Sequence, residues 1–284
     1  MSIRIHAQSI YTDVVPGFEG NGGDGYRRIN EGVCRVYQRV LRPDTVVEPC
    51  FVTRSTYLTS HAYLELLNNV ELLRGIIDGE ARGCDVAFIR CGNDPALREA
   101  REAVRIPVVG MSEAAMHFAC RLGSRFAMIG VDDKSVPLVE RNIRLYGLEG
   151  RAISRKPVRI PTVPGFEAVV KNGPMWFDSP DYVREHVIPA FEETARGCID
   201  DGAEVIVTAC ALFGALTLAD YNKVSGTEVP VVDSLAVGIK TAEMTGDLYR
   251  TLGVATSKHL SYQSQLLPET RDALMAPFFP TGKG

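Results

Sequence analysis

The chain alternates short apolar runs with amphipathic stretches, and this alternation predicts α/β units around mostly parallel sheets. Residues 25–41 and 61–82 carry apolar positions at helical spacing, and Pro95 favours the first turn of a helix that runs through Ala103. Four apolar runs of the first half have the length of buried strands: IRIHAQSI (3–10), TVVEPCFV (45–52), DVAFIR (85–90) and IPVVG (106–110).

The second half repeats this order of strands and helices. Each half places a cysteine directly after its third strand, Cys91 in the first and Cys210 in the second. An internal duplication explains the match and predicts two domains that share a cleft. The elements predicted for this half are strands at RFAMIG (125–130), RAISRKPV (151–158), EVIVTA (204–209) and VPVVD (229–233), and helices near 135–147, 181–200 and 213–222.

Length and charge restrict the class of protein. A chain of 284 residues gives roughly two domains at about 150 residues each. The net charge is −4 and the basic residues are scattered, so we expect neither nucleic acid nor a membrane surface as a partner. No apolar run has the ~18 residues of a membrane helix, and Arg4, His6 and Gln8 interrupt any signal-peptide core. We therefore expect a cytoplasmic protein with a small-molecule substrate.

The cysteines carry the chemistry that the sequence suggests. Seven cysteines without metal-type pairs favour reduced thiols over disulfides or a zinc site. A thiol at the carboxyl end of a strand, where a helix begins, lies beside unsatisfied backbone N–H groups that favour the thiolate. If Cys91 and Cys210 face each other across a cleft, one takes a proton from a carbon and the other delivers one to the opposite face. The remaining five are expected to be inert core residues.

Two long loops interrupt the repeat, at 14–25 and at 160–180. Both follow strand ends, so each is a candidate cover for the cleft. The second contains Trp176, for which a pocket wall and simple packing are equally good interpretations. The first satisfies the spacing G-x-G-x-x-G over 20–25, but it starts about ten residues after its strand, whereas a dinucleotide site needs the glycines immediately after the strand.

Other catalytic motifs give weaker signals. His61 and His117 have no metal-binding spacing, and Asp132 with Asp133 suits a helix cap. No stretch combines a Schiff-base lysine with a phosphate cradle, and no G-x-S-x-G elbow is present. We therefore expect chemistry without a cofactor and without a metal.

The segments CGNDPALREAREAVRIPVVGMSEAAMHFACRLG (91–123), GAEVIVTACALFGA and VPVVDSLAVGIKTAEM (within 202–244) resemble the aspartate/glutamate/hydantoin racemase superfamily, and its hydantoin racemase branch most. The resemblance implies two pseudo-symmetric three-layer α/β domains, each with a mostly parallel four-stranded sheet and with the active site in the cleft between them. The implied domains are 1–111 with the returning segment 233–284, and 112–232. It also implies a homo-oligomer and a cofactor-independent mechanism in which Cys91 and Cys210 are the catalytic pair.

The resemblance also implies substrate contacts at Gly92 and Asn93 beside the first cysteine. The chain departs from the family at Ser112, where relatives have glycine, and at His6-Ala7-Gln8-Ser9, where many have Asn-Pro-Asn-Thr. Beside the second cysteine, Leu212 and Phe213 are larger than the family residues, which would reshape the cleft. The predicted substrate-binding residues are Gln8, Ser9, Thr53, Gly92, Asn93, Ser112 and Ala211, of which the backbone N–H groups near Gly92 and Ala211 would hold carbonyl oxygens where charge develops.

Three functions remain open at this point. The first is a racemase or epimerase that inverts a carbon acid next to a carbonyl, on a substrate of the hydantoin or amino-acid-derived kind. The second uses one essential cysteine on the same scaffold, as the decarboxylases and cis-trans isomerases of the superfamily do. The third is a small-molecule binding protein whose cysteines only pack at the domain interface.

Overall fold

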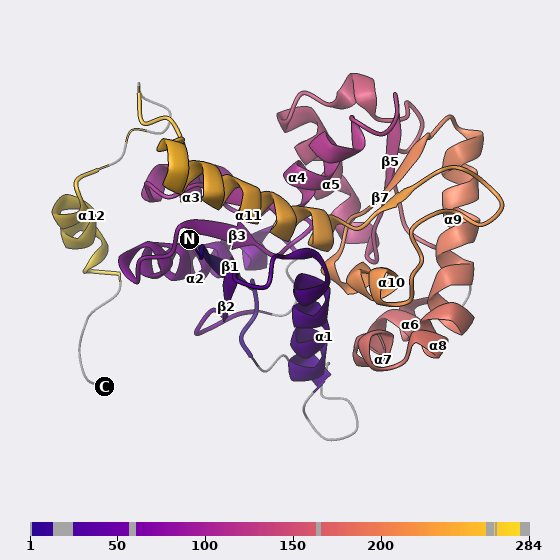
Figure 1. Cartoon of the computed structure of the whole chain (residues 1–284), viewed down its shortest axis with the longest axis horizontal. Helices are drawn as coiled ribbons and strands as arrows, with labels where there is room; N and C mark the ends of the chain where they lie inside the picture. The colour runs from indigo at the N-terminus through magenta and orange to yellow at the C-terminus, as the bar shows by residue number, and fades with distance from the viewer. Residues whose placement is uncertain are drawn as a thin grey trace.

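The computed structural model describes residues 2–13, 25–56, 61–162, 166–259, 264 and 266–278. Within these ranges the chain forms two four-stranded parallel sheets, each covered by helices (Figure 1). The predicted α/β class with two four-stranded sheets is therefore confirmed. The glycine-rich motif over 20–25 lies almost wholly outside the described residues.

The first sheet has the order β2-β1-β3-β4. Its central strands pair in parallel with Ile5 opposite Val86 and Gln8 opposite Ile89. Every residue of β3 is fully buried, as expected for a strand that helices cover on both faces. The strands are β1 (Arg4–Gln8), β2 (Val46–Cys50), β3 (Val86–Ile89) and β4 (Val108–Gly110).

The second sheet repeats that order as β6-β5-β7-β8. The match of the two strand orders agrees with the duplication predicted from the sequence. One strand was misplaced: the run 151–158 forms only a single bridge from Ala152 to Phe126, and the paired strand begins at Val158. The strands are β5 (Phe126–Ile129), β6 (Val158–Arg159), β7 (Val205–Thr208) and β8 (Val231–Val232).

The helices lie close to their predicted positions, with two exceptions in length. The helix expected from Pro95 begins two residues later, because Ala96 is in the left-handed region with φ 51°. The helix expected over 213–222 is a short 3₁₀ turn, Ala211–Phe213, followed by α10 (Gly214–Leu218). The other helices named below are α1 (Gly25–Val40), α2 (Ala62–Ala81), α3 (Leu97–Ala103), α4 (Met111–Ala119), α5 (Val136–Leu145), α9 (Ile188–Asp200), α11 (Ser234–Leu252) and α12 (Pro268–Met275).

A long helix from the end of the second repeat packs on the first sheet. Gly238 of α11 lies against Phe88 of β3, where an added Cβ would be 2.6 Å from the ring. Further along the same helix, Gly246 lies against Val86 and Ile3. Figure 1 shows α11 running across the first sheet toward α3. These contacts are those expected if 233–284 belongs with the first domain, although the division into domains remains a prediction.

The excursion at 160–180 is mostly helical rather than an open loop. It forms α6 (Phe166–Lys171) and α7 (Gly173–Asp178). Trp176 is 1% exposed and its ring centroid lies 5.5 Å from that of Phe213. Phe177 packs on α1 at Gly32, where an added Cβ would lie 2.2 Å from the phenyl ring. Trp176 therefore packs in the core, and the segment is held in place by aromatic burial.

The helix predicted over 181–200 is interrupted by a wider turn. It begins as α8 (Pro180–Tyr182), continues as a π-helical turn over Val183–Val187 and becomes α9. Pro189 in the first turn of α9 has no N–H to donate to the carbonyl four residues back, and its ring crowds that carbonyl. The widened turn accommodates this crowding.

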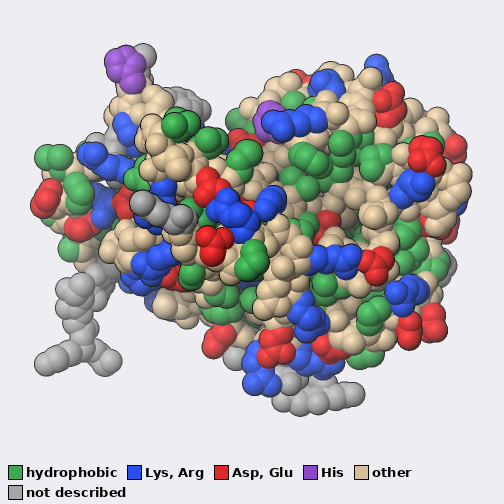
Figure 2. Space-filling model, in the orientation of Figure 1, with side chains coloured by type: hydrophobic (Ala, Val, Ile, Leu, Met, Phe, Trp, Pro, Cys, Tyr) green, Lys and Arg blue, Asp and Glu red, His purple; other side chains and the backbone are tan. Residues whose placement is uncertain are grey.

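The surface carries charge of both signs. Lys and Arg side chains alternate with Asp and Glu over the face shown in Figure 2, without a stripe of one sign. In the described part of the chain, no helix is both long and apolar enough to cross a bilayer.

Candidate active site

Cys91 follows β3 at the carboxyl edge of the first sheet. It is partly buried and packs against the apolar cluster that α2 and α3 contribute, which includes Leu72 and Leu97. The backbone N–H of Asn93 donates toward its sulfur. The chain turns sharply after this contact, and Asp94 is in the left-handed region with φ 45°. The side chain of Cys91 is thus held by the turn rather than by a helix end.

Cys210 occupies the matching place after β7. It is partly buried and is the residue before the 3₁₀ turn Ala211–Phe213. The backbone N–H of Leu212 donates toward its sulfur. Each sulfur therefore receives an N–H from the residue two positions further along, so the repeat extends to the hydrogen bonding of the two thiols.

The two cysteine segments are in backbone contact. A Cβ added to Gly92 would lie 1.8 Å from the carbonyl oxygen of Ala209 and 3.5 Å from the backbone nitrogen of Cys210. Only a glycine permits this approach. The residue after the first cysteine therefore touches the residue before the second, which brings both thiols to the same junction of the two sheets.

Burial raises the pKa of both thiols, whereas the sequence led us to expect that the thiolate would be favoured. It raises the pKa of Cys210 to about 11 and that of Cys91 further still, although the backbone N–H groups at each sulfur act the other way. The nearby carboxylate of Glu65 also raises the pKa of Cys91. Both groups are therefore thiols at neutral pH, and the backbone N–H groups only limit the cost of ionisation.

A buried carboxyl braces the turn after Cys91. Asp94 Oδ1 accepts from the backbone N–H of Ser112 at 2.9 Å, and Oδ2 accepts from that of Glu113 at 2.7 Å. These are free donors in the first turn of α4, so Asp94 caps that helix from a distance in sequence. Burial raises the pKa of Asp94 to about 7 against these hydrogen bonds. The hydroxyl of Ser112 in turn donates to the carbonyl of Gly92 at 2.6 Å.

The second repeat contributes further contacts to the same turn, from α5 and from the residue that follows it. Asn142 Nδ2 donates to the carbonyl oxygen of Asn93 at 2.7 Å. The Tyr146 hydroxyl donates to Asp94 Oδ2 at 2.8 Å. The Cys91 turn is therefore held by α4 on one side and by the α5 segment on the other.

The predicted substrate-binding residues divide into two groups. Gly92, Asn93, Ser112 and Ala211 lie in or against the two cysteine turns, as described above. Gln8 is fully buried, where its side chain bonds His6 at 2.7 Å and the carbonyl of Ser9 at 2.8 Å. Thr53 is exposed and donates to the carboxylate of Glu71. The substrate contacts of all these residues remain predictions.

Besides Asp94, Asn142 and Tyr146, the residues near the cysteines that were missed in the sequence are Tyr26, Glu65 and Arg90. Tyr26 lies in the first turn of α1. Its hydroxyl forms a hydrogen bond with Ser9 Oγ at 2.7 Å and accepts one from Arg90 Nη2 at 3.4 Å. Glu65 in the first turn of α2 is 8% exposed. The position of Arg90, directly before Cys91, was a usable signal, whereas nothing in the local pattern distinguishes Tyr26 or Glu65 from ordinary helix residues.

The expectation that Phe213 lies beside the cleft was wrong. Its side chain is fully buried among aromatic rings, 5.2 Å from the ring centroid of Phe191 and next to Trp176. Phe213 is part of the apolar core, against which Cys210 also packs. Leu212 is also buried, at 9% exposure.

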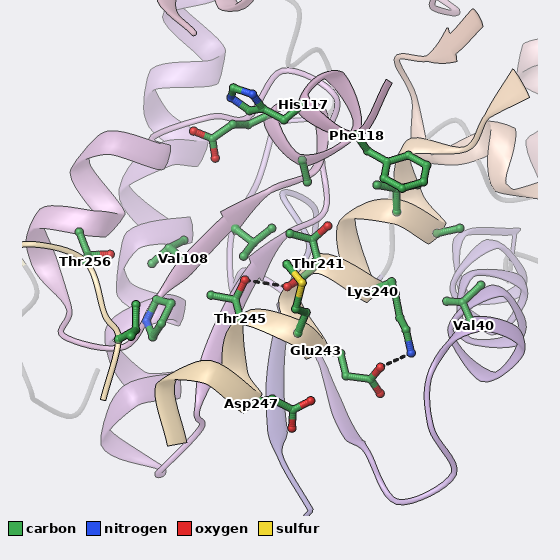
Figure 3. Close-up of a pocket in the computed structure, with 18 of the residues that line it drawn as sticks. Val40, Val108, His117, Phe118, Lys240, Thr241, Glu243, Thr245, Asp247 and Thr256 are labelled. Atoms are coloured by element: carbon green, nitrogen blue, oxygen red, sulfur yellow. Dashed lines mark hydrogen bonds and ion pairs between the residues drawn. The ribbon is translucent and has the colours of Figure 1, made fainter. Parts of the chain in front are cut away.

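A groove of about 980 Å³ lies away from the two thiols, along the seam between α4 and α11 (Figure 3). Val108 and Phe118 line it together with the ion pair between Lys240 and Glu243. Neither cysteine is among its lining residues. The cysteine turns are the candidate active site because two matched thiols lie at one junction there, whereas the groove is lined mainly by α4, α11, β4 and the segment after α11. Within the described ranges, no three His, Cys, Asp or Glu side chains are grouped as metal ligands.

Comparison with known proteins decides the family. A model of the Asp/Glu/Hydantoin racemase family matches residues 26–242, well over half of the chain. The chain belongs to the Asp/Glu/Hydantoin racemase family. This confirms the resemblance noted from the cysteine segments, and the relatives agree: hydantoin racemase from Rhizobium meliloti is 32% identical over 186 residues, which are 65% of this chain and 70% of the relative.

Two further relatives extend the match within the family. Hydantoin racemase from Pseudomonas sp. (strain NS671) is 28% identical over 83% of this chain and 86% of its own. Allantoin racemase from Klebsiella pneumoniae has the same fold, with a TM-score of 0.69 and 22% identity over 94% of both chains. This member of the family is therefore an isomerase of the racemase type.

Proposed function

We propose that this racemase uses Cys91 and Cys210 as its two acid–base groups. The observation that supports the pair is the contact of Gly92 with the carbonyl of Ala209, which brings the two cysteine turns together at one junction. Each thiol is partly exposed, and each has a backbone N–H directed at its sulfur.

The proposed reaction inverts a carbon next to a carbonyl. The thiolate of one cysteine takes the proton from the carbon and becomes a thiol, and the electron pair of the broken C–H bond moves onto the carbonyl oxygen as an enolate. The thiol of the other cysteine then protonates the opposite face of the carbon and becomes the thiolate. The protein ends with the proton exchanged between its two sulfurs, and reversal of the roles serves the other enantiomer.

We propose a cyclic, hydantoin-like substrate, on the basis of the curated relatives. The carbon acid of such a ring carries neither an ammonium nor a free carboxylate on the reacting carbon, so its enolate needs less stabilisation. Backbone N–H groups near Gly92 and Ala211 would donate to the enolate oxygen, and one such donor typically lowers the barrier by about 3 kcal/mol.

Solvent exchange tests the proposal directly. Single enantiomers of 5-substituted hydantoins are incubated with the protein in deuterated water, and we expect deuterium at the stereocentre together with loss of optical rotation. Single variants Cys91→Ser and Cys210→Ser should each lose racemisation, and Cys120→Ser, on a cysteine outside the two turns, is the matched control. Full racemisation by either active-site variant would disprove the paired mechanism.

The same assay separates the alternatives. Release of carbon dioxide from a substituted malonate, with one cysteine dispensable, would assign the decarboxylase activity instead. Thermal stabilisation by a hydantoin without exchange would assign a binding protein. Two further predictions have their own tests. Cell fractionation checks the predicted cytoplasmic location, and size-exclusion chromatography checks the predicted homo-oligomeric state.

A further inference from the structure

Arg90 places a positive charge directly before Cys91. It is partly buried, and its backbone N–H donates to the carbonyl oxygen of Gln8 at 3.0 Å. Among the residues that the structure describes, no carboxylate forms an ion pair with its guanidinium, whose one hydrogen bond is to the Tyr26 hydroxyl. Two other partly buried arginines of the fold have a carboxylate partner, Arg101 with Glu113 and Arg159 with Asp201. A partly buried guanidinium that directly precedes a candidate catalytic cysteine and has no carboxylate partner is suited to a ligand's anion.

The groups around this guanidinium are held in place. Tyr26 is 8% exposed and packs edge-to-face on Tyr11, with ring centroids 5.6 Å apart. Its hydroxyl bonds Ser9 Oγ at 2.7 Å and accepts from Arg90. Burial raises the pKa of Tyr26, and negative charge on either Cys91 or Cys210 acts in the same direction. The Tyr26 hydroxyl is therefore within electrostatic reach of both sulfurs.

The side chains of Arg90 and Cys91 point in different directions. Cys91 packs against the cluster that includes residues of α2 and α3, whereas the preceding residue, Arg90, reaches Tyr26 on α1. Neighbouring residues at the end of a strand point to opposite faces. The guanidinium thus lies on the α1 side of the first turn, beside the Tyr26 hydroxyl.

Glu65 places a carboxylate on the other side of Cys91. Glu65 is in the first turn of α2, on the same buried face as Leu72 and Ile76. Its Oε1 has no hydrogen-bond partner among the described residues. This carboxylate repels an anion on the α2 side, while Arg90 attracts one on the α1 side.

We propose that Arg90, held by its hydrogen bond to the Tyr26 hydroxyl, binds a carboxylate on the substituent of the substrate, so that the preferred substrates are cyclic ureides derived from acidic amino acids. This inference rests on the proposed racemase function. The guanidinium offers two parallel N–H groups to the carboxylate.

Two hydantoins of similar size test the proposal, 5-carboxymethylhydantoin and the uncharged 5-isobutylhydantoin. We expect the wild type to have the higher kcat/KM for the carboxylate. Arg90→Gln should lower the ratio of the two values by about ten- to a hundredfold, as expected for a lost charge-assisted hydrogen bond, mainly through KM. Arg90→Lys should retain part of the ratio. Arg125→Gln, on an exposed arginine before β5, is the matched control and should leave the ratio unchanged.

Each remaining outcome has a definite meaning. Racemisation of both compounds with equal kcat/KM, or an equal loss for both in Arg90→Gln, overturns the carboxylate site and leaves the racemase function standing. Absence of exchange with both compounds and with other hydantoins overturns the proposed function itself.

Discussion

The Cα of Gly92 lies against the carbonyl of Ala209, so close that a Cβ on Gly92 would be 1.8 Å from the carbonyl oxygen. The neighbour here is backbone at the end of β7, which cannot move aside without moving Cys210. The relative placement of the two thiols therefore depends on the absence of one side chain.

Replacement of Gly92 by alanine should separate the two cysteine turns. We expect a loss of about 1–3 kcal/mol in the free energy of unfolding, typical of overpacking, and a fall of about a hundredfold in kcat/KM for a misplaced catalytic group. Urea unfolding and the racemisation assay measure the two effects. Gly150→Ala is the control, because nothing lies within 4 Å of a Cβ at that position. Wild-type activity in Gly92→Ala would refute the close approach.

The carboxyl of Asp94 is expected to hold the first cysteine turn. Asp94→Ala leaves the N–H groups of Ser112 and Glu113 and the Tyr146 hydroxyl without their acceptor. A buried donor without a partner costs about 1–3 kcal/mol, so we expect at least that loss in the free energy of unfolding. Urea denaturation of the variant and of Asp133→Ala, an exposed aspartate, provides the comparison. A loss no greater than that of the control would argue against the brace.

The ionisation of the thiols predicts the pH dependence of catalysis. Burial raises the pKa of Cys210 to about 11 and of Cys91 higher, so both are protonated at pH 7 in the free enzyme. Below such a pKa the thiolate fraction grows tenfold per pH unit, and kcat/KM reports the free enzyme. We expect log kcat/KM to rise with a slope near one from pH 7 to 9.5. A plateau or a decline over that range would contradict the assignment of a thiol as the base.

Local sequence predicted the strands and the duplication because both depend on short apolar runs and on residues at matched positions. The same reasoning placed Cys91 and Cys210 correctly after β3 and β7. It could not place residues whose role depends on distant contacts. The segment that forms α6 and α7 is rich in Pro and Gly, and its helices are stabilised by burying Trp176 and Phe177 on other parts of the fold.

The candidate site shows the same limit. Asp94, next to the Cys91 turn in sequence, caps α4 only because β4 brings Ser112 beside it. Tyr26 and Glu65 reach the thiols from the first turns of two helices, and a helix pattern gives no information on which first-turn residue faces the end of a sheet. Phe213 was misjudged because its burial depends on Trp176 and Phe191, which the fold brings to it from distant parts of the sequence.

The charge of Glu65 gives the last prediction, which concerns the reactivity of Cys91. The ionised carboxylate raises the pKa of Cys91. Its Oε1 has no hydrogen-bond partner among the described residues, so Glu65→Gln breaks no hydrogen bond at that atom. The variant should therefore lower the pKa of Cys91. At pH 9 we expect alkylation of Cys91 by iodoacetamide, followed by mass spectrometry, to be roughly three- to tenfold faster, as a like charge at an effective dielectric constant near 20 predicts.

Two comparisons isolate this effect from general loosening of the fold. Glu149→Gln removes an exposed carboxylate and should leave the alkylation rate of Cys91 unchanged. Cys210 has no contribution from Glu65 to its pKa, so its alkylation rate should be the same in Glu65→Gln as in the wild type. Faster alkylation of both cysteines would mean a more open site, and an unchanged rate at Cys91 would mean that Glu65 does not act on the thiol. Faster alkylation of Cys91 alone is the result that an electrostatic effect requires.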